Sequence, residues 1–276
     1  IEYGRTPLDQ LDANLTIGSE VFSGGVLDQT AIEVNANFVS FSSLLTSSSI
    51  LAGNSVLLEN LESPTLAVGL YEGTYTATSA GETAGAEFFN NTGLRNFEVT
   101  DNIYSTDGIG VHPAANLTVG SIGTDTFGPD SADEFIIANR YHIKNNAMIS
   151  GMRVMLATGT DVGAELIGVV MDTATFFAND VTPLLQTDNI VAVTAADIAN
   201  GYKDLWFSWV ETLPANSYMF GVQLYSNANT ADIRILDDQT VAQPSDASMI
   251  YIAGDLTAYT NGEAVAIRLL MGDQWG

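Results

Sequence analysis

The 276-residue sequence contains no cysteine, and it has only eight lysine and arginine residues against 33 aspartate and glutamate residues. Without cysteine, the chain cannot form a disulfide, a thiolate metal site or a thiol nucleophile. The net charge of −25 repels the phosphate backbone of nucleic acids and anionic lipid headgroups. We therefore expect neither nucleic acid nor a membrane surface as a partner.

Long apolar runs are also missing. The most apolar region, residues 41–61, is interrupted by Ser, Asn and Glu, whereas a membrane helix needs roughly 18 uninterrupted apolar residues. The sequence therefore predicts no membrane insertion. It does not start with a basic segment followed by an apolar one, so we expect Ile1 to begin a mature or trimmed chain.

Lysine is nearly absent, with Lys144 and Lys203 as the only two, while Ser, Thr, Asn and Gly are abundant. Few trypsin-like proteases would cut such a chain. Together with the missing cysteine, this composition favours an exported bacterial protein. We expect an extracellular or cell-surface location.

Catalytic motifs are absent as well. The sequence has no G-x-S-x-G elbow, no H-E-x-x-H helix and no phosphate-binding loop. Of its two histidines, His112 precedes Pro113 at a suspected domain junction and is interpreted as a linker residue, and His142 is interpreted as a strand residue. We therefore predict no catalytic residue, no certain cofactor and no enzymatic activity.

Strand patterns dominate what is present. In the first part of the chain, Ile32, Val34, Ala36 and Phe38 alternate with polar residues, which is the period of a strand with one face in water. Further strands are expected at residues 56–61, 66–76 and 96–100, separated by turns rich in Ser and Gly.

The second part alternates in the same way at residues 152–156 and 218–224, and at least seven strands are expected there. Residues 164–171 are apolar on both faces apart from one glutamate, which predicts a central strand covered from both sides. Only residues 194–200 favour a helix, so no crossover helices exist for parallel pairing. The predicted fold class is all-β, with two tandem antiparallel β-sandwich or jelly-roll-like domains.

An internal echo suggests where these domains divide. Residues 13–19, ANLTIGS, recur as ANLTVGS at residues 115–121. Tandem domains are one explanation, and a common strand-start phrase that occurs twice by chance is the other. We predict an extended N-terminal segment at 1–12, a small β-sandwich at 13–112 and a larger jelly-roll-like sandwich at 113–276.

Three segments of the second part carry a family resemblance: GTDVGAELIGVVMDTATF (159–176), LPANSYMFGVQLYSNANTADIRILDD (213–238) and SMIYIAGDLTAYTNGEAVAIRLLMG (248–272). Over about residues 121–276 the chain resembles a β-sandwich segment of large secreted or cell-surface proteins of Bacteroidetes-type bacteria, which look like type IX secretion cargo. The resemblance implies a β-sandwich that precedes a C-terminal sorting domain, without an assigned activity. No sorting domain follows here, which implies cleavage during export or a fragment.

Acidic loops are candidate cation sites. Asp125, Asp130, Asp133 and Glu134 lie within ten positions, and calcium takes six to eight oxygen ligands from such loops. A structural calcium ion is therefore a hypothesis for this cluster. The alternative, which we favour, is that the acids simply keep the surface solvated, because the spacing does not match an EF-hand.

A group of aromatic residues, Tyr202, Trp206 and Trp209, is a candidate ligand-binding site, since exposed aromatics on sandwiches form platforms for sugar rings. In a regular strand, residues 207 and 209 share one face and Trp206 points to the other. At least part of the group would then be buried, and packing in the core is the favoured interpretation.

Two functional hypotheses follow. The first is a non-enzymatic structural surface protein: a subunit of a filament, sheath or surface layer, or a spacer of an adhesin, which associates with itself or with neighbouring surface proteins. Its N-terminal residues 1–11 could add as a strand to a neighbour's sheet, or they could be an ordinary free terminus. The second is a carbohydrate-binding module of a secreted protein, with glycans as partners.

Overall fold

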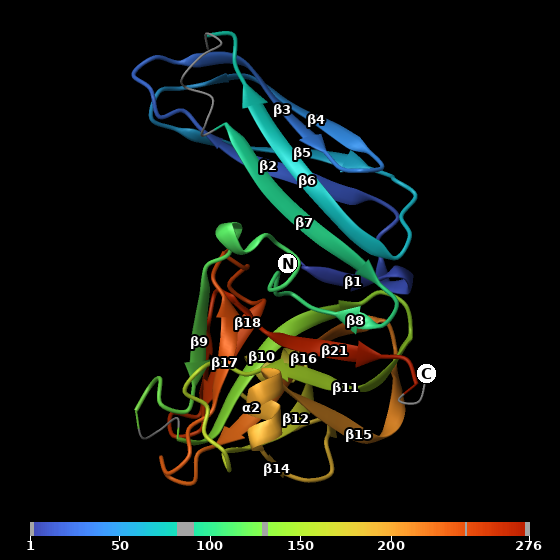
Figure 1. Ribbon diagram of the computed structural model, residues 1–276, viewed down its shortest axis with the longest axis vertical. Helices are drawn as coiled ribbons and strands as arrows, with labels where there is room; N and C mark the ends of the chain where they lie inside the picture. The colour runs from blue at the N-terminus through green and yellow to red at the C-terminus, as the bar shows by residue number, and fades with distance from the viewer. Residues whose placement is uncertain (1–2, 82–90, 129–131, 241, 274–276) are drawn as a thin grey trace.

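The computed structural model describes residues 3–81, 91–128, 132–240 and 242–273. It has two lobes stacked along the long axis of the molecule, a small lobe of early strands and a large lobe of later ones (Figure 1). The predicted all-β fold class is confirmed, because nearly every regular element is a strand in a multi-stranded sheet. Among these residues, no helix has the length and apolar character that crossing a membrane would require.

The small lobe packs a five-stranded sheet against a two-stranded one. The larger sheet has the order β1-β7-β6-β3-β4, and the smaller one pairs β2 with β5. The predicted alternation is confirmed in β3, where Ile32, Val34 and Ala36 are buried and Glu33 and Asn35 are exposed. The strands are β1 (Arg5–Pro7), β2 (Leu15–Phe22), β3 (Gln29–Asn37), β4 (Ser42–Ile50), β5 (Ser55–Glu62), β6 (Gly69–Thr78) and β7 (Thr92–Thr100).

The large lobe contains three sheets. Their orders are β13-β12-β16-β10-β18-β19 with β14 beside β12, then β15-β11-β21-β8, and then β20-β17-β9. The strands are β8 (Ile103–Tyr104), β9 (Val119–Gly123), β10 (Asp133–Ile143), β11 (Ala147–Met155), β12 (Glu165–Asp172), β13 (Leu185–Gln186), β14 (Val191–Ala192), β15 (Tyr202–Leu213), β16 (Asn216–Tyr225), β17 (Arg234–Asp238), β18 (Ser248–Ile252), β19 (Thr257–Thr260), β20 (Ala264–Val265) and β21 (Ile267–Met271).

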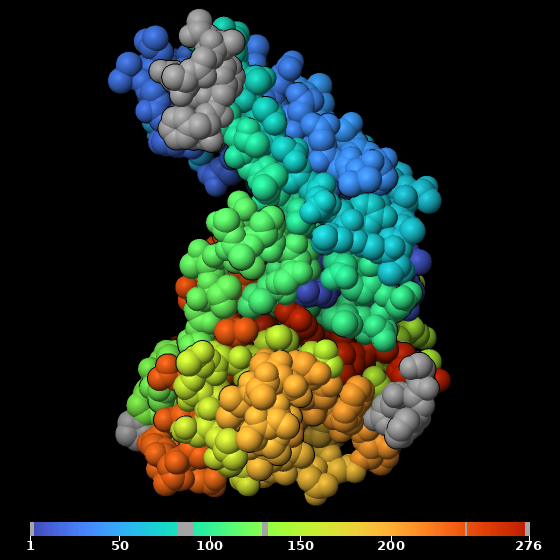
Figure 2. Space-filling view, viewed as in Figure 1, coloured from blue at the N-terminus to red at the C-terminus, as the bar shows by residue number. Residues whose placement is uncertain are grey.

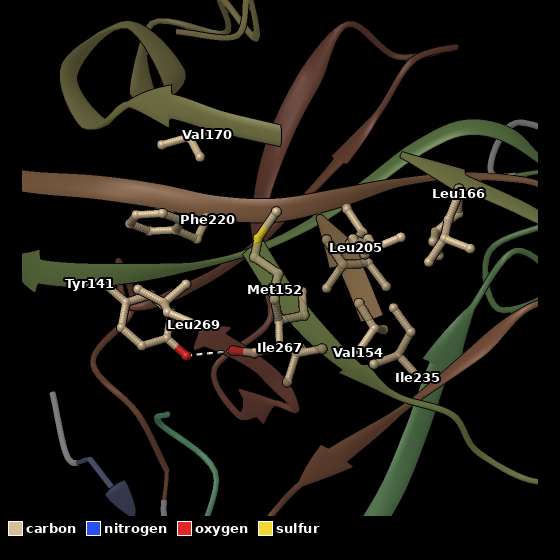
Figure 3. Close-up of a cluster of buried hydrophobic side chains, with 14 of the residues drawn as sticks. Tyr141, Met152, Val154, Leu166, Val170, Leu205, Phe220, Ile235, Ile267 and Leu269 are labelled. Atoms are coloured by element: carbon tan, nitrogen blue, oxygen red, sulfur yellow. Dashed lines mark hydrogen bonds between the residues drawn. The ribbon is translucent and has the colours of Figure 1, made fainter. Parts of the chain in front are cut away.

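The main core of the large lobe lies between its two larger sheets. Aliphatic and aromatic side chains from β10, β12 and β16 meet those from β11, β15 and β21, as Figure 3 shows for Leu166, Phe220 and Leu205. The hydroxyl of Tyr141 donates to the carbonyl of Ile267 at 2.5 Å, so the one polar group of this ring is satisfied inside the core.

The second face of the seven-stranded sheet is covered too. Ile167, Val169 and Met171 of β12 point into a second cluster, which Phe176 of the short helix α1 (Thr173–Phe177) closes. Six consecutive residues of β12 are therefore buried, which confirms the central strand predicted at residues 164–171. Such a strand reads as a continuous apolar run because neither face meets water.

Two short α-helices interrupt the strands in the described residues. The helix α2 (Ala195–Asn200) is the one predicted, and Thr194 and Asp197 form a reciprocal capping box at its start. The helix α1 was not predicted. Its start is satisfied by the Asp172 side chain, which accepts from the backbone N–H groups of Ala174 and Thr175.

The N-terminal segment departs from its prediction. Instead of remaining extended for a neighbour or free, residues 5–7 form β1 and pair in parallel with residues 98–100 of β7. A 3-10 turn, Leu8–Gln10, follows, and its Gln10 side chain is buried and bonded to the backbone of Lys144 and Asn145. The other strand pairs of the described ranges are antiparallel, as predicted.

The two copies of the internal echo adopt different structures. In the first copy, residues from Leu15 onward form β2, which pairs along its whole length with β5. In the second, Ala114–Asn116 forms a 3-10 turn and the strand β9 begins only at Val119. The repeated phrase therefore does not mark equivalent positions in two related folds.

Removing a core side chain tests the packing of the large lobe. We expect Leu166→Ala to lower the free energy of unfolding by about 2–5 kcal/mol, because Leu166 is fully buried between the two sheets. Leu184→Ala is the matched control, and it should change the free energy by less than about 0.5 kcal/mol because Leu184 is 54 % exposed. Urea denaturation followed by circular dichroism measures both; equal effects would contradict this packing.

Candidate functional site

A cleft of about 1100 Å³ lies where the two lobes meet and reaches into the open side of the small lobe. Its walls come from β2, β5, β6 and β7, and from the N-terminal segment and the end of β10. Figure 2 shows the N-terminal segment, in blue, at the waist between the lobes. The aromatic side chains in its lining are Tyr3, Phe38, Tyr75, Phe97 and Tyr104, and the charged ones are Asp12, Glu20, Glu59, Arg95 and Lys144.

His142 also lines this cleft, as a residue of the strand β10. Its Nδ1 lies 2.5 Å from the Ser217 hydroxyl oxygen. Burial lowers the pKa of His142, and the positive charges of Arg140 and Lys144 lower it further. A Ser-His-acid triad needs a carboxylate that holds the imidazole and stabilises its charged form. In the part of the chain that the structure describes, no carboxylate is hydrogen-bonded to this ring. The cations Arg140 and Lys144 lie near it.

Aromatic side chains join the N-terminal segment to the large lobe. The ring of Tyr3 lies 4.6 Å from that of Tyr104 and 5.9 Å from that of Tyr141. The Tyr3 hydroxyl accepts from the N–H of His142, and the Tyr104 hydroxyl donates to the His142 carbonyl. Burial raises the pKa of all three phenols, so they stay neutral. Tilted rings of this kind add to the energy of area burial.

A buried ion pair lies beside these rings. The guanidinium of Arg268, on β21, donates two hydrogen bonds to the Asp107 carboxylate at 2.9 and 2.7 Å. Arg5, on β1, donates to Glu98 at 2.9 Å and has a guanidinium nitrogen 3.8 Å from Asp107. Both arginines also donate to the carbonyl of Ile109. The loop after β8 is thereby held between a strand of the small lobe and a strand of the large lobe.

His112 is part of this junction, and its interpretation as a linker residue is wrong. The imidazole is buried, and its Nδ1 accepts from the backbone N–H of Asn96 on β7. A Cβ atom at Gly108 would lie 2.1 Å from the His112 ring, so only glycine leaves room for it. Among the described residues, Nε2 has no hydrogen-bond partner. Burial lowers the pKa of His112 to about 4, and the charge of Arg95 contributes.

Two adjacent aspartates on β17, of which Asp238 lies near this histidine, contribute carboxylates to this region. Asp238, on β17, accepts from the N–H of Gly108 at 2.6 Å. Its neighbour Asp237 is buried beside Glu263, and burial, followed by the hydrogen bond and the negative charge of Glu263, raises the pKa of Asp237. The neutral form of Asp237 is therefore favoured compared with an exposed aspartate.

The described members of the predicted calcium cluster interact with different partners. Asp125 forms an ion pair with Arg234, and the Asp133 carboxylate accepts from the backbone N–H groups of Ser226 and Ala228. Glu134 adopts a left-handed backbone conformation at φ 63°. Asp130 lies outside the described residues. Within the described ranges no group of three or more potential metal ligands occurs, so calcium at this cluster stays a prediction without a preformed site.

The predicted aromatic group is on the surface. Trp206 is 46 % exposed and Trp209 is 66 % exposed, whereas Phe207 is buried. The expectation of core packing for the tryptophans is therefore wrong. The reason is an irregularity in β15: Trp206 pairs with Gly151 and Glu211 with Ile149, so five positions on β15 span two on β11 and the regular alternation is lost.

The three aromatic residues differ in their surroundings. A Cβ atom at Gly151 would lie 3.0 Å from the Trp206 indole, so the ring packs directly over the backbone of the neighbouring strand. The indole N–H of Trp209 donates to Glu211. Tyr202, at the other end of β15, lies under the guanidinium of Arg153, which is 3.8 Å from the ring centroid. The Tyr202 ring is therefore occupied by a contact within the chain, whereas both indole rings are exposed to solvent.

Several junction residues escaped sequence analysis, above all Arg5, Asp107 and Arg268. They are 102 and 161 positions apart along the chain, and no local pattern connects them. One signal was available in the scarcity of cations. Ion pairs with carboxylates engage the side chains of Arg5, Arg140, Lys144, Arg153, Lys203, Arg234 and Arg268. A cation in so acidic a chain is therefore a signal of an internal contact.

Comparison with protein-family models gives no match, and comparison with curated proteins gives no relative.

The junction predicts a dependence of stability on pH. Because the pKa of folded His112 is about 4, against about 6.5 in an unfolded chain, the unfolded state binds more protons between these values. The contribution of His112 to the free energy of unfolding is thus fully present above pH 6.5, and it is lost as the pH falls toward 4. His112→Asn retains an acceptor for the Asn96 N–H and removes the titration.

From pH 7 to pH 4.5, we expect the unfolding free energy of His112→Asn to fall less than that of the wild type, by roughly 1–2 kcal/mol. Urea denaturation at the two pH values measures the difference. His142→Asn is the control, because His142 is less buried and should have a smaller effect. A variant at position 112 that is as acid-sensitive as the wild type would refute the assignment.

Proposed function

We propose that the chain is a non-enzymatic structural protein of the cell exterior, acting as a stiff two-lobed subunit of a filament, sheath or surface layer, or as a spacer of an adhesin. The observation that carries this proposal is the junction between the lobes. Lobes joined by a simple linker move relative to one another by default. Here aromatic packing, a buried ion pair and a buried histidine connect them, which supports a unit that transmits force without bending.

The orientation of the lobes is specified by directional contacts. Two hydrogen bonds from Arg268 align the Asp107 carboxylate within the large lobe, and Arg5 of the small lobe donates to the Ile109 carbonyl of the same loop. A buried ion pair contributes little net stability compared with apolar packing, but breaking it leaves an uncompensated charge. This favours a defined geometry over maximum stability, as expected of a subunit that must present its surfaces at fixed positions.

The charge of the chain supports the proposed location and partners. With the cations engaged in ion pairs inside the molecule, the accessible charge is mostly carboxylate. Such a surface stays hydrated at high salt and repels anionic polymers. Partners are then other copies, neighbouring surface proteins or glycans, and nucleic acid is disfavoured.

Electron microscopy tests the structural role. We expect antibodies against the chain to label the outside of the source cells, and negatively stained native material to show ordered polymers or layers with a regular repeat. The control for antibody specificity is that the antibodies recognise both the recombinant chain and the same chain in purified surface fractions. Label confined to the cell interior, or native material that consists only of separate particles with reproducible catalytic turnover, would contradict the proposal.

The second candidate is carbohydrate binding, favoured by the exposed indoles of Trp206 and Trp209 on an edge strand. Flat aromatic faces pack against the apolar faces of sugar rings. The indole over Gly151 is supported from below and open above, which is the arrangement that such a platform needs.

Glycan arrays test this candidate. If it is correct, Trp206→Ala and Trp209→Ala should each weaken binding to the recognised polysaccharide about tenfold, equivalent to about 1.4 kcal/mol. Tyr259→Ala is the matched control, since Tyr259 is an exposed aromatic residue on β19 of the same lobe. No binding across the array, or equal losses in all three variants, would reject the aromatic platform.

A further inference from the structure

The sandwich of the small lobe is incomplete on one side. Among the residues that the structure describes, its five-stranded sheet faces two strands, and β2 is an edge strand of this smaller sheet. The β2–β5 pair packs mainly over β3 and β4. Toward β6 and β7, an aromatic cluster remains half-buried: Tyr71 stacks on Phe97 with ring centroids 4.9 Å apart, and Tyr75 lies nearby. A further strand beside β2 would cover this cluster.

The open edge of β2 offers the hydrogen bonds that such a strand needs. Ser23 donates its N–H to Asn54 and accepts from Gly53, so the odd-numbered residues of this strand bond to β5. By alternation, the N–H and C=O groups of Thr16, Gly18 and Glu20 point to the other side. In the described part of the chain, these groups have no backbone partner.

The cleft described above lies along this edge and is lined by residues of β2 together with Phe38, Tyr75 and Phe97. At about 1100 Å³ it exceeds the roughly 300–1,000 Å³ of ordinary small-molecule sites. A row of unpaired backbone groups above an apolar floor matches an extended polypeptide, which pairs through its main chain and inserts alternate side chains.

The chain already completes its other sheet in this manner. The strand β1 comes from the N-terminal segment and adds to the edge of β7 at residues 98–100, where the N–H of Glu98 donates to the carbonyl of Gly4. An added strand therefore already covers one sheet edge of the small lobe where it meets the large lobe. The open edge of β2 continues the same boundary on the facing sheet.

Charge on the outer face indicates the kind of strand. Glu20 on β2 and Glu59 on β5 are both exposed beside the cleft, and Glu59 lies opposite Gly18. The outward side chains of an added strand would lie next to these carboxylates. Opposite charges on neighbouring strands stabilise pairing, and like charges oppose it. An acidic segment, including most of this chain, would be repelled.

From these observations we infer that the open side of the small lobe is an acceptor site for an extended, basic segment of a partner protein. The segment pairs with the edge of β2 at Thr16, Gly18 and Glu20. Its apolar side chains cover the cluster of Phe97 and Tyr75, and its lysine or arginine side chains lie beside Glu20 and Glu59. This inference deepens the proposed structural role, and rests on it, by naming the class of partner.

A labelled synthetic peptide tests the site directly. The probe is a nonapeptide of the sequence KVKVTVKVK, and the controls are a peptide of the same composition with contiguous valines and one with glutamate in place of lysine. We expect only the first to raise fluorescence polarisation at micromolar protein. In hydrogen exchange followed by mass spectrometry, it should protect the amides of β2.

Paired variants separate a specific site from general attraction. Glu20→Lys together with Glu59→Lys should weaken binding at least about tenfold. Glu33→Lys with Glu72→Lys changes the net charge equally on the exposed face of the other sheet and should weaken it less than about threefold. Gly18→Pro removes an N–H that points to the open edge and leaves the bonds to β5, so it should also weaken binding at an unchanged unfolding midpoint.

Three outcomes would overturn the inference: no binding by the alternating peptide, equal weakening by the two charge pairs, or protection of β4 or β19 instead of β2. If Gly18→Pro fails to fold, the charge pairs and the exchange pattern still decide. Peptide binding without ordered polymers on cells would retain the acceptor site and reject the structural role. Ordered polymers without peptide binding would do the reverse.

Discussion

The buried carboxylate of Asp107 is the constraint on which the two-lobed arrangement depends, because Arg268 of the large lobe binds it and Arg5 of the small lobe lies 3.8 Å from it. Asp107 is fully buried, and the partners that neutralise it come from β21 of the large lobe and, at longer range, from β1 of the small lobe. Removing one member of a buried pair costs about 3–5 kcal/mol, a large part of the stability of an ordinary domain. The loop that carries Asp107 also carries His112, so the same anchor determines where that imidazole meets β7. Asn96, whose N–H donates to that imidazole, also lines the cleft.

Local pattern was sufficient for much of the fold. Alternation identified β3 and β16, the continuous apolar run identified the doubly covered β12, and the helical character of residues 194–200 identified α2. Each of these signals depends on residues within about ten positions of one another. The parallel pairing of β1 with β7 has no such signal, because its partners are 93 positions apart. Topology of this kind depends on the balance of the whole molecule.

The candidate sites show the same limit. The tryptophans of β15 were expected in the core because regular alternation assigns them opposite faces, and one irregularity opposite Ser150 exposed both. His112 resembled a linker residue because proline follows it, yet its environment comes from Asn96, Gly108 and Asp238 of β17. The acidic cluster was identified by proximity in sequence, and its described members turn to different partners, such as Arg234 for Asp125. The free edge of β2 could not be predicted, because an edge exists only once the order of strands is known.

The parallel strand β1 also constrains the order in which the molecule can fold. Residues 5–7 are synthesised first, but their partner segment, residues 98–100, emerges some ninety residues later. Closing so long a loop has a substantial entropic cost, and non-local strand pairing of this kind is slow. Until that loop closes, the β7 edge at residues 98–100 is unprotected, and the Tyr3 ring lacks its contacts with Tyr104 and Tyr141. The N-terminal residues, which are synthesised first, thus pair with the last strand of the small lobe to be synthesised. Completion of the sheet of the small lobe and its packing against the large lobe therefore occur together, late in folding.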